Sequence, residues 1–359
     1  MLTALALFGA APAEQPVHIT IGYQPYYTGA WGAVVVKERA LLQKYLPPGS
    51  TVDWEVGLQG SAITNNMLAG KYDVGYVGDM PGIVAATKRS IGDIRLLALT
   101  SYNQEQCNNL LVRPDAPKFR SGEDALRWLN GKTVGITAGT CTDRFARQIF
   151  ERENVHPAAV VNEGIEALTA DLRAQKLDAA FAWQPTVARV STSVGNGSAR
   201  LVSTGSDWNS YDAGLLIVRK DFLDQHPGAV QAILRAEIEA ERYMISDYPQ
   251  HACSVVDDVE KDTTGFTKRE LWAALYGAPA LDGRASDGVH WSAHLVFDPQ
   301  VRSFLTKSSD FLLSAKVIAS PLPSDAIVDG PLTEALDSLH VRAPLGDAPR
   351  KPLASYPCG

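Results

Sequence analysis

The chain has 359 residues, a formal net charge of −7, and 45% hydrophobic and 20% charged residues. This length exceeds one ordinary hydrophobic core, so two lobes or domains are expected. The acidic balance disfavours nucleic acid and anionic membranes as partners, because no excess of basic side chains is available to neutralise phosphates.

Residues 1–13 are typical of a secretory signal peptide. The apolar run "LTALALFGAAPA" (2–13) ends in small residues and is followed by the polar Glu14. It is too short to span a bilayer, and a buried N-terminal helix is the alternative for such a run. The basic segment that normally precedes such a run is missing, so we expect translation to start upstream of Met1. We expect cleavage near Ala13 and an exported, soluble mature chain.

The chain contains four cysteines, Cys107, Cys141, Cys253 and Cys358. Their spacing matches no zinc or redox motif, and an even number in an exported chain permits two disulfides. We expect Cys107 to pair with Cys141 and Cys253 with Cys358. No cysteine lies near the cleavage site, so a lipid-anchored form is not expected.

Strands and helices alternate from residue 17 onwards. The first series consists of strands at 17–23, 50–57, 72–78 and 93–101, and of helices at 30–46, 61–70 and 81–90. A second series follows "YNQEQCNN" (102–109), with strands at 110–115, 132–137, near Val160, at 177–183 and 199–204, and helices at 121–131, 142–154, 164–176 and from Gln184. Strands separated by helices of this length predict parallel sheets.

The chain then continues through "YDAGLLIVRKDFL" (211–223) into a long helix at 227–245, and residues 250–359 are predicted to be mostly helical and rich in loops. Two successive series of similar elements predict an α/β fold with two lobes that face each other. Ligands of open parallel sheets bind outside the carboxyl ends of the strands, which is where the most informative residues fall.

Four strand-to-helix joints stand out: "GYQPYYTGAWG" (22–32), "GLQGSAITN" (57–65), "VGYVGDMPG" (74–82) and "ITAGTCTDR" (136–144). Each joint alone is explained by an ordinary helix N-cap, and Thr140-x-x-Asp143 fits a capping box. If they converge on one cleft, the helix N-termini supply N–H donors and partial positive charge to a small anionic group. The hydroxyls of Ser61, Thr140 and Thr142 add neutral donors.

Aromatic and acidic residues near these joints suggest further contacts. Tyr23, Trp31 and Trp183 could form the walls of a pocket, although core packing is the alternative for each of them. Asp79 and Asp212 would favour a positive group on the ligand. Asp79 is equally well explained as an N-cap, whereas Asp212 lies where the chain returns to the first lobe.

The remaining candidate residues do not predict catalysis. Arg144 is the one cation near the fourth joint, and we expect it to be solvated on the helix face. His290 and His294 are four residues apart, but without an acidic partner motif they are expected to be a chance pair, so no metal site is predicted. The chain contains no zinc-protease, phosphate-loop, dinucleotide or Gly-x-Ser-x-Gly motif.

With these residues assembled, the chain resembles periplasmic solute-binding proteins of ABC importers, in particular the taurine, alkanesulfonate, nitrate and thiamine-pyrimidine family. The resemblance rests on "AGKYDVGYVGDMPG" (69–82), "LNGKTVGITAGTCTD" (129–143), "KLDAAFAWQPTVAR" (176–189), "YDAGLLIVRKDFLDQHP" (211–227) and "DFLLSAKVIASPLPSDAIVDGPLTEAL" (310–336). It implies a type II periplasmic-binding-protein fold, in which two crossover segments near 100–108 and 204–212 join the lobes.

The resemblance also implies domains and contacts. Lobe 1 is expected at 17–102 plus 213–250, lobe 2 at 103–212, and a C-terminal helical region at 251–359, packed on lobe 1. The candidate ligand residues are Tyr23, Gln24, Trp31, Gly60, Ser61, Gly78, Asp79, Thr137, Gly139, Thr140, Cys141, Thr142, Trp183 and Asp212. The chain departs from the family at Cys141, where a small polar residue is usual, and in its longer C-terminal region.

The function implied is the extracytoplasmic binding component of an ABC importer. The protein is expected to be a periplasmic monomer without cofactor or enzymatic activity, which docks on a membrane permease served by a separate ATPase. A zwitterion such as taurine fits best, with its anion at 60–61 and 137–142 and its ammonium facing Asp212. The alternative ligands are an alkanesulfonate, nitrate, a pyrimidine and a small cation such as guanidinium.

Other functions are less compatible with the sequence. A pyrimidine synthase of the related fungal type uses a Cys-rich run that this chain lacks. A transcription-factor ligand domain would need a helix-turn-helix where the leader stands. A pure adhesion role would leave the four joints unexplained.

Overall fold

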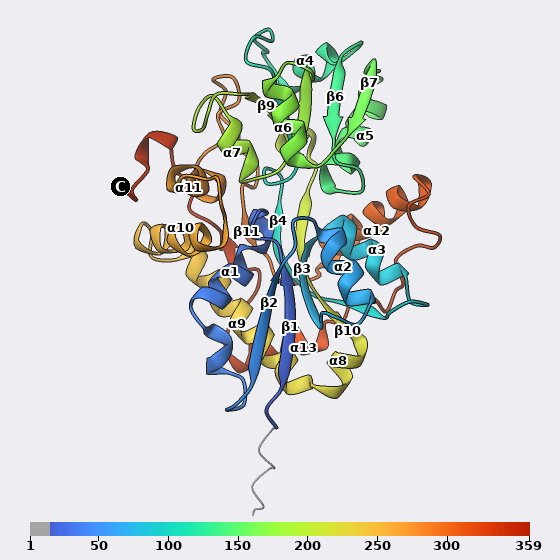
Figure 1. Ribbon diagram of the computed structural model, residues 1–359, viewed down its shortest axis with the longest axis vertical. Helices are drawn as coiled ribbons and strands as arrows, with labels where there is room; N and C mark the ends of the chain where they lie inside the picture. The colour runs from blue at the N-terminus through green and yellow to red at the C-terminus, as the bar shows by residue number, and fades with distance from the viewer. Residues whose placement is uncertain (1–14) are drawn as a thin grey trace, which may run out of the picture.

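The computed structural model describes residues 15–359, which form two α/β lobes, one above the other in Figure 1. Each lobe is built on one five-stranded sheet. The predicted α/β class with two lobes is therefore confirmed. The expected signal peptide, residues 1–13, lies outside the described residues.

The sheet of lobe 1 has the strand order β2-β1-β3-β10-β4. Its strands are β1 (His18–Tyr23), β2 (Thr51–Val56), β3 (Val74–Gly78), β4 (Ile94–Asn103) and β10 (Asp212–Arg219). The sheet of lobe 2 has the order β7-β6-β8-β5-β9. Its strands are β5 (Asn109–Val112), β6 (Thr133–Ile136), β7 (Ala159–Asn162), β8 (Ala179–Ala182) and β9 (Arg200–Thr204). A two-stranded sheet of β11 (Ser292–Ala293) and β12 (Gly346–Asp347) completes the set.

The prediction of purely parallel sheets is wrong, because β10 runs antiparallel to β3 and β4, and β5 runs antiparallel to β8 and β9. Each of these two strands is the first one after a crossover from the other lobe. It therefore enters its sheet at the edge that faces the other lobe, where β1, β3, β6 and β8 end. The carboxyl ends of these parallel strands consequently face the space between the lobes.

Both faces of each sheet are covered, so the central strands are continuously buried. In β10, Leu216 and Val218 belong to the apolar cluster on one face, and Leu215 and Ile217 to the cluster on the other. Successive side chains of a strand point to opposite faces, which explains this division. The run "AGLLIV" (213–218) within β10 is therefore apolar throughout rather than alternating.

The helices pack on these faces. They are α1 (Trp31–Glu38), α2 (Gly60–Leu68), α3 (Asp79–Thr87), α4 (Gly122–Trp128), α5 (Cys141–Glu153), α6 (Ile165–Arg173), α7 (Thr186–Val190), α8 (Lys220–Gln225), α9 (Pro227–Ile245), α10 (Gln250–Asp262), α11 (Lys268–Tyr276), α12 (Pro299–Ser314) and α13 (Gly330–Ser338). Short 3-10 turns are η1 (Thr28–Ala30), η2 (Leu41–Lys44), η3 (Gly205–Trp208) and η4 (Leu353–Ser355). Across residues 15–359, none of the helices combines the length and apolarity needed to cross a membrane.

The single helix predicted over 30–46 is interrupted. Helix α1 ends at Glu38, and Ala40 has a φ of 51°, in the left-handed region, before η2 begins. The apolar residues on the two sides of this break, Val36 and Leu41, are both buried in the same core. The apolar pattern therefore predicted correctly that Val36 and Leu41 are buried. It did not predict the change in backbone direction between them.

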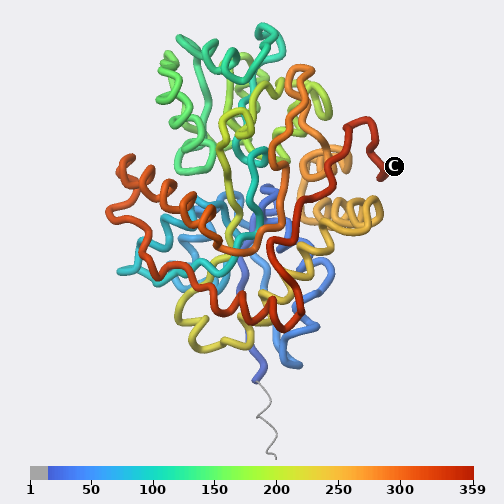
Figure 2. Tube along the Cα trace, turned by 180° about the vertical axis from the view of Figure 1, so that it is seen from behind, coloured from blue at the N-terminus to red at the C-terminus, as the bar shows by residue number. Residues whose placement is uncertain are grey.

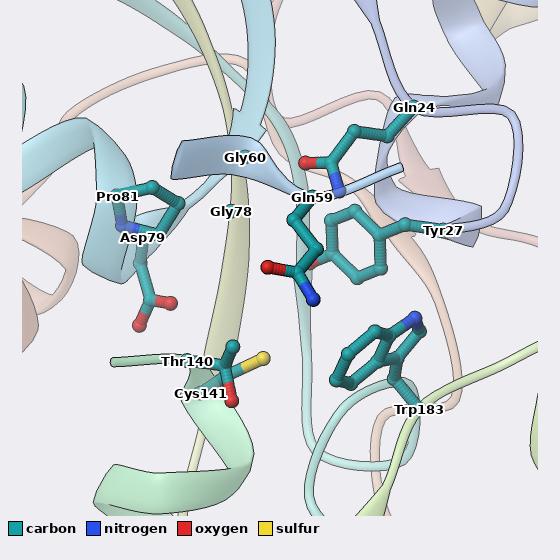
Figure 3. Close-up of a pocket in the computed structure, with 10 residues that line it drawn as sticks. All are labelled: Gln24, Tyr27, Gln59, Gly60, Gly78, Asp79, Pro81, Thr140, Cys141 and Trp183. Carbon is teal, nitrogen blue, oxygen red and sulfur yellow. The ribbon is translucent and has the colours of Figure 1, made fainter. Parts of the chain in front are cut away.

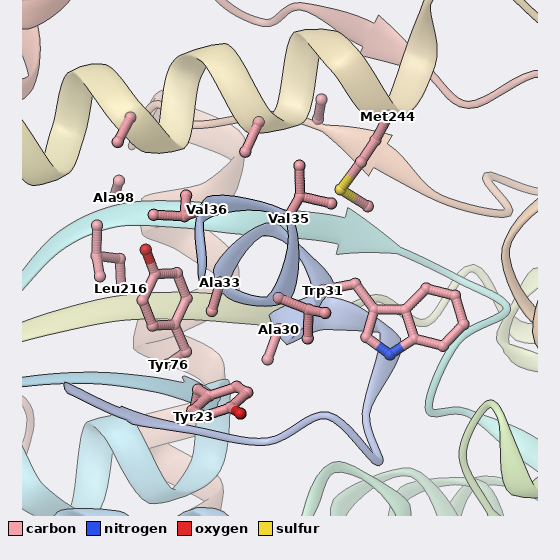
Figure 4. Packing of buried hydrophobic residues seen from close by; sticks show 14 of the residues in the cluster. Tyr23, Ala30, Trp31, Ala33, Val35, Val36, Tyr76, Ala98, Leu216 and Met244 are labelled. Atoms are coloured by element: carbon pink, nitrogen blue, oxygen red, sulfur yellow. The ribbon is translucent and has the colours of Figure 1, made fainter. Parts of the chain in front are cut away.

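Helices α1 and α9 form the apolar core on one face of the lobe 1 sheet, shown in Figure 4. Trp31 is fully buried there, and its indole N–H donates to the backbone oxygen of Pro25 at 2.9 Å. Tyr23 is equally buried and donates its hydroxyl to Asp262 Oδ2 at 2.9 Å. Both aromatic residues are thus part of the core, the alternative that their sequence context left open.

The C-terminal region packs on lobe 1, but not only there. Between α11 and α12 the chain rises along lobe 2, as the orange segment in Figure 2 shows. Leu281 joins an apolar cluster of lobe 2, and Asp282 Oδ1 lies 3.3 Å from the guanidinium of Arg200 in β9. Arg284 also donates to the backbone oxygen of Val202 at 2.8 Å. The expectation that residues 251–359 pack on lobe 1 is incomplete. The segment between α11 and α12 contacts lobe 2 and so connects the two lobes.

Two disulfides connect distant segments. Cys107, in the crossover from β4 to β5, is bonded to Cys141 at the start of α5. Cys253 in α10 is bonded to Cys358 near the end of the chain. These are the pairs expected from the sequence. The first fixes the start of α5 to the crossover, and the second holds the C-terminal segment against α10.

A buried pair of acids, Glu237 and Glu241, lies on α9 where it packs in lobe 1. Tyr76 donates its hydroxyl to Glu237 Oε2 at 2.9 Å. Burial raises the pKa of Glu237 to about 7, and burial together with the charge of Glu237 raises the pKa of Glu241 well above its usual value. Ionising either group therefore destabilises the folded state.

We expect Glu241→Gln to stabilise the protein at neutral pH, because Gln keeps the neutral form that burial imposes on Glu241 in the folded state. A carboxyl whose folded pKa is raised contributes stability below its unfolded pKa and loses it as the pH rises through the folded value. The gain should therefore vanish near pH ~4 and grow toward pH ~8. Urea denaturation across this range measures it. Glu239→Gln, a half-buried position on the same helix paired with Lys44, is the control. An equal effect of both variants at all pH values would contradict the prediction.

Candidate ligand-binding site

A cavity lies between the two lobes and has an empty volume of about 380 Å³, including the part that is open to solvent. We call it the interlobe cavity. Figure 3 shows its lining residues, which point toward one another from both lobes. They are Gln24, Tyr27, Gln59, Gly60, Gly78, Asp79, Pro81, Thr140, Cys141 and Trp183.

All four joints predicted from the sequence contribute to this cavity. Gln24 and Tyr27 follow β1, Gln59 and Gly60 open α2, Gly78 to Pro81 open α3, and Thr140 and Cys141 open α5. Trp183 follows β8 and closes the wall from lobe 2. The joints meet because the parallel strands of both sheets end toward the same space.

Three helices present uncapped N-termini at this cavity. The N-cap residues of α2, α3 and α5 are Gln59, Gly78 and Thr140, and none of their side chains accepts a capping hydrogen bond. The first N–H groups of a helix have no backbone acceptor within the helix, so those of α2 and α5 stay available to a ligand, whereas the N–H of Met80 in α3 donates to Asp79 Oδ1. Together with the helix dipoles they favour an anionic group.

The predicted capping box between Thr140 and Asp143 is wrong, because neither of its two hydrogen bonds forms. The Thr140 hydroxyl donates to the backbone oxygen of Thr137 at 2.7 Å instead of accepting from the helix. Asp143 Oδ2 does reach back, but to the N–H of Gly139 at 3.0 Å. The first N–H groups of α5 are thereby left uncapped at the cavity.

Gly60 permits the close approach of α2 to the cavity wall. A Cβ at this position would lie 2.5 Å from Pro81 Cγ and 3.1 Å from Gln24 Oε1. Such a contact with Pro81 requires a neighbour to move. The N-terminus of α2 can therefore face the cavity at this distance only with glycine at position 60.

Asp79 and Arg144 form a buried ion pair between the lobes. Arg144 Nη2 lies 3.1 Å from Asp79 Oδ2 and donates to the backbone oxygen of Tyr211 at 2.6 Å. The prediction that Arg144 is solvated is wrong, because only 3% of it is exposed. Asp79 is the first residue of α3 rather than its N-cap, and Asp79 Oδ1 accepts from the N–H of Met80 at 2.9 Å. Burial raises the pKa of Asp79, and Arg144 opposes this shift.

Asp212 does not line the cavity, contrary to its expected contact with a ligand. It is fully buried directly behind Tyr27, whose hydroxyl lies 3.4 Å from Asp212 Oδ1. Its other oxygen accepts from the N–H of Cys107 at 3.1 Å. Burial, reinforced by the negative charge of Asp79, raises the pKa of Asp212 to about 7. Its charge can still act on a ligand over a short distance through a medium of low dielectric constant.

The other candidate residues occupy several places. Gln24, Gly60, Gly78, Asp79, Thr140, Cys141 and Trp183 line the cavity, whereas Tyr23, Trp31, Ser61, Thr137, Gly139, Thr142 and Asp212 do not. Ser61 is exposed at the first turn of α2. The hydroxyl of Thr137 donates to the backbone oxygen of Glu163 at 2.8 Å, and that of Thr142 lies 2.7 Å from that of Thr140.

Three lining residues were not among the candidates: Tyr27, Gln59 and Pro81. Each lies within a predicted joint, and Gln59 directly precedes the candidate Gly60. Tyr27 is one of four aromatic residues in the first joint, of which the sequence favoured two others. Only the turn at 24–27 determines that Tyr27 faces the other lobe while Tyr23 faces the core.

The two histidines have separate structural partners. His290 Nδ1 lies 3.0 Å from Glu105 Oε2 in the crossover, and His294 Nε2 lies 2.9 Å from Asp298 Oδ2. Arg350 also lies 3.3 Å from Glu105. Residues of the C-terminal region therefore hold the crossover between β4 and β5 through ion pairs with Glu105. The histidines therefore do not share a site.

Comparison with known proteins places the chain in a family. Residues 51–252 match the family described as NMT1/THI5 like. The taurine-binding periplasmic protein of Escherichia coli (strain K12) is 28% identical over 253 residues, which cover 69% of this chain and 72% of that protein.

Solved structures share the fold. The alkanesulfonate-binding protein SsuA from Xanthomonas axonopodis pv. citri, bound to MOPS, has a TM-score of 0.66 and 16% identity, covering 90% of this chain and 100% of its own. The nitrate-binding protein NrtA from Synechocystis PCC 6803 has a TM-score of 0.72 and 15% identity, covering 94% and 93%. The desulfurization enzyme DSZB has a TM-score of 0.63 and 16% identity, covering 90% and 99%.

These neighbours confirm the predicted periplasmic-binding-protein fold, and they include both binding proteins and an enzyme. At such low identities, the structural likeness establishes the fold alone. The family match is independent of it and covers β2 through the whole of the long helix α9 and the start of α10, including three of the four joints in full. Because this match extends over more than half of the 359 residues, the chain belongs to the NMT1/THI5-like family.

Proposed function

We propose that this protein is the extracytoplasmic binding component of an ABC importer and that it captures taurine or a closely related zwitterionic sulfonate in the interlobe cavity. One observation carries the choice of ligand. The cavity combines uncapped helix N-termini with the carboxylate of Asp79, and none of its ten described lining residues is a lysine or arginine.

The anionic end of the ligand is assigned to the N-termini of α2 and α5. Gly60 and Cys141 are the first residues of these helices and lie on opposite sides of the cavity. Backbone N–H groups bind an oxyanion without an opposing formal charge, which keeps the binding reversible. The side-chain amides of Gln24 and Gln59 supply further donors.

The ammonium end is assigned to Asp79, with Asp212 behind it. Asp79, Asp212 and Arg144 together carry one net negative charge when both acids are ionised. An ammonium group neutralises this charge, and a plain sulfonate does not. The rings of Tyr27 and Trp183, both in the cavity wall, cover the short carbon chain between the two ends and offer their faces to the cation.

Capture is proposed to follow from closure of the lobes. A ligand that contacts residues of both lobes binds the closed state more tightly, and only this difference in affinity can shift the equilibrium toward closure. The closed monomer then docks on a membrane permease, and a separate ATPase drives import. This places the mature protein in the periplasm, after removal of the leader near Ala13.

We propose binding rather than catalysis, although the fold also occurs in the desulfurization enzyme DSZB. Cys141, the one cysteine among the described lining residues of the cavity, is disulfide-bonded and offers no thiol. The hydroxyl of Thr140 donates to the backbone oxygen of Thr137, and its other hydrogen-bond partner within residues 15–359 is the hydroxyl of Thr142. Nucleophilic catalysis needs an activating base within hydrogen-bond reach.

A thermal-shift screen of the mature chain tests the proposal with taurine, ethanesulfonate, nitrate, a pyrimidine and guanidinium. Linkage predicts stabilisation of about 2.7 kcal/mol by a ligand at about 100 times its Kd. Taurine should give the largest shift. No shift with taurine would contradict the ligand assignment, and turnover of taurine would contradict the binding function.

Two glycine variants locate the binding. Gly60→Ala introduces a methyl group against Pro81 and should reduce the shift with taurine strongly. Gly330→Ala is the matched control, because a Cβ at Gly330 meets no described atom within 4 Å. Equal shifts in both variants would place the ligand elsewhere.

A further inference from the structure

A second and larger cavity lies on the flank of the molecule, between α5, the crossover before β10 and α12. Its empty volume is about 960 Å³, including the part that is open to solvent. Helix α12 packs on α3 below α5, as Figure 1 shows. We call this the flank cavity. It shares no lining residue with the interlobe cavity.

The flank cavity is lined by cations. Arg144, Arg152 and Lys307 line it, and no acidic side chain does so among its described lining residues. The guanidinium carbons of Arg144 and Arg152 lie 5.0 Å and 5.4 Å from the ring centres of Phe304 and Trp208, respectively. Arg144 Nη2 already bonds to Asp79 and to the backbone oxygen of Tyr211, and Arg152 Nε lies 3.3 Å from Glu153 Oε1. The other N–H groups of these two guanidinium groups, together with the ammonium of Lys307, are left to donate to an oxyanion. The electrostatic field in the cavity therefore favours an anion.

Two buried polar groups in this wall lack partners. Ser308 is 1% exposed, and its hydroxyl has no hydrogen-bond partner within residues 15–359. Arg144 is 3% exposed, and its Nε is likewise without a partner there. Both atoms are themselves covered, so they add polarity to the wall rather than direct contacts with a ligand.

Aromatic rings supply the rest of the wall. Tyr102 and Tyr211 are stacked with 4.5 Å between their ring centres and 9° between their planes. Phe304 meets Tyr102 edge-on, with 5.5 Å between the ring centres. All three rings line the cavity next to the cations. A wall of this composition suits a ligand with both a flat ring and a negative charge.

We propose that the flank cavity is a second ligand site, which binds a small aromatic anion, that is, an oxyanion attached to an aromatic ring. The oxyanion contacts Arg144, Arg152 and Lys307, and the ring packs against Phe304 and Tyr211. This site is independent of the proposed function of the interlobe cavity, because it requires neither taurine nor closure of the lobes.

Calorimetric titration of the mature chain with phenyl phosphate tests the proposal. We expect one binding event that Arg152→Gln/Lys307→Gln weakens by about tenfold, since each lost charge-assisted contact reduces affinity. Ser303→Trp, which places bulk on the exposed face of α12 at the cavity, should weaken it as well. The matched control is Arg120→Gln/Lys71→Gln, with the same charge change at exposed positions outside the cavity.

Further ligands separate the contributions of ring and charge. Phenol and inorganic phosphate should each bind at least about tenfold more weakly than phenyl phosphate, because each lacks one half of the recognition. Absence of phenyl phosphate binding, or binding that neither Arg152→Gln/Lys307→Gln nor Ser303→Trp weakens, would overturn the proposal. Inorganic phosphate bound as tightly as phenyl phosphate would overturn the role of the aromatic wall.

Discussion

Asp79→Asn is expected to weaken the binding of taurine by about a hundredfold, the order of magnitude for removing one partner of a buried charge pair. Asp79 is the one carboxylate among the described lining residues of the interlobe cavity. Ethanesulfonate, which differs from taurine by lacking the amine, should bind the variant as well as or better than the natural protein. The reason is that Arg144 loses its neutralising partner.

Calorimetric titration of both ligands into both proteins measures this difference. Asp258→Asn is the matched control, because Asp258 is also a buried carboxylate paired with an arginine, but it lies on α10 and does not line the cavity. It should change the affinity for neither ligand by more than a small factor. A similar loss for taurine and ethanesulfonate in Asp79→Asn would contradict the assignment of Asp79 as the ammonium partner.

The affinity for taurine is expected to rise with pH up to about pH 7, and that for ethanesulfonate to fall. Burial raises the pKa of Asp212 to about 7, so this group changes from neutral to charged near physiological pH. Ionised Asp212 attracts the ammonium of taurine, and a bound ammonium in turn favours the ionised form. At pH values below the pKa that Asp212 has in the unliganded protein, binding of taurine therefore releases protons. In this pH range the affinity for taurine increases with pH.

Asp212→Asn should remove most of the pH dependence of the affinity for both ligands, because the side chain at position 212 no longer titrates. Asp310→Asn, an exposed position on α12, should leave the pH dependence unchanged. Titrations between pH ~5 and pH ~8 cover the window set by this group. The same direction of change for taurine and ethanesulfonate would contradict the role of Asp212, since one charge must affect opposite ligand charges in opposite ways.

Arg144 connects the two cavities. Its Nη2 atom pairs with Asp79 in the wall of the interlobe cavity, while the same side chain lines the flank cavity. An anion in the flank cavity would therefore compete with Asp79 for Arg144. Any resulting coupling must be reciprocal, so taurine would change the affinity of the flank cavity by the same factor.

The sequence by itself determined the alternation of elements and the positions of the joints. Strand and helix periods are local properties, so "VHITIGY" and "PGAVQAILRAEIEAERYMI" correspond closely to β1 and α9. The joints follow from the same local patterns, since Gly60, Gly78 and Thr140 stand where a period of two changes to a period of 3.6. The disulfides also pair the cysteines in the order in which they occur in the chain, the first with the second and the third with the fourth.

The tertiary structure alone decided which side chains face the ligand. Tyr23 and Tyr27 belong to the same joint, but the turn between them directs one into the core and the other into the cavity. Arg144 looked like a surface residue, and its partner Asp79 lies 65 positions away in the other lobe. A periodic pattern records whether a residue is buried, but not which distant group it meets, because that depends on how the two crossovers bring the lobes together.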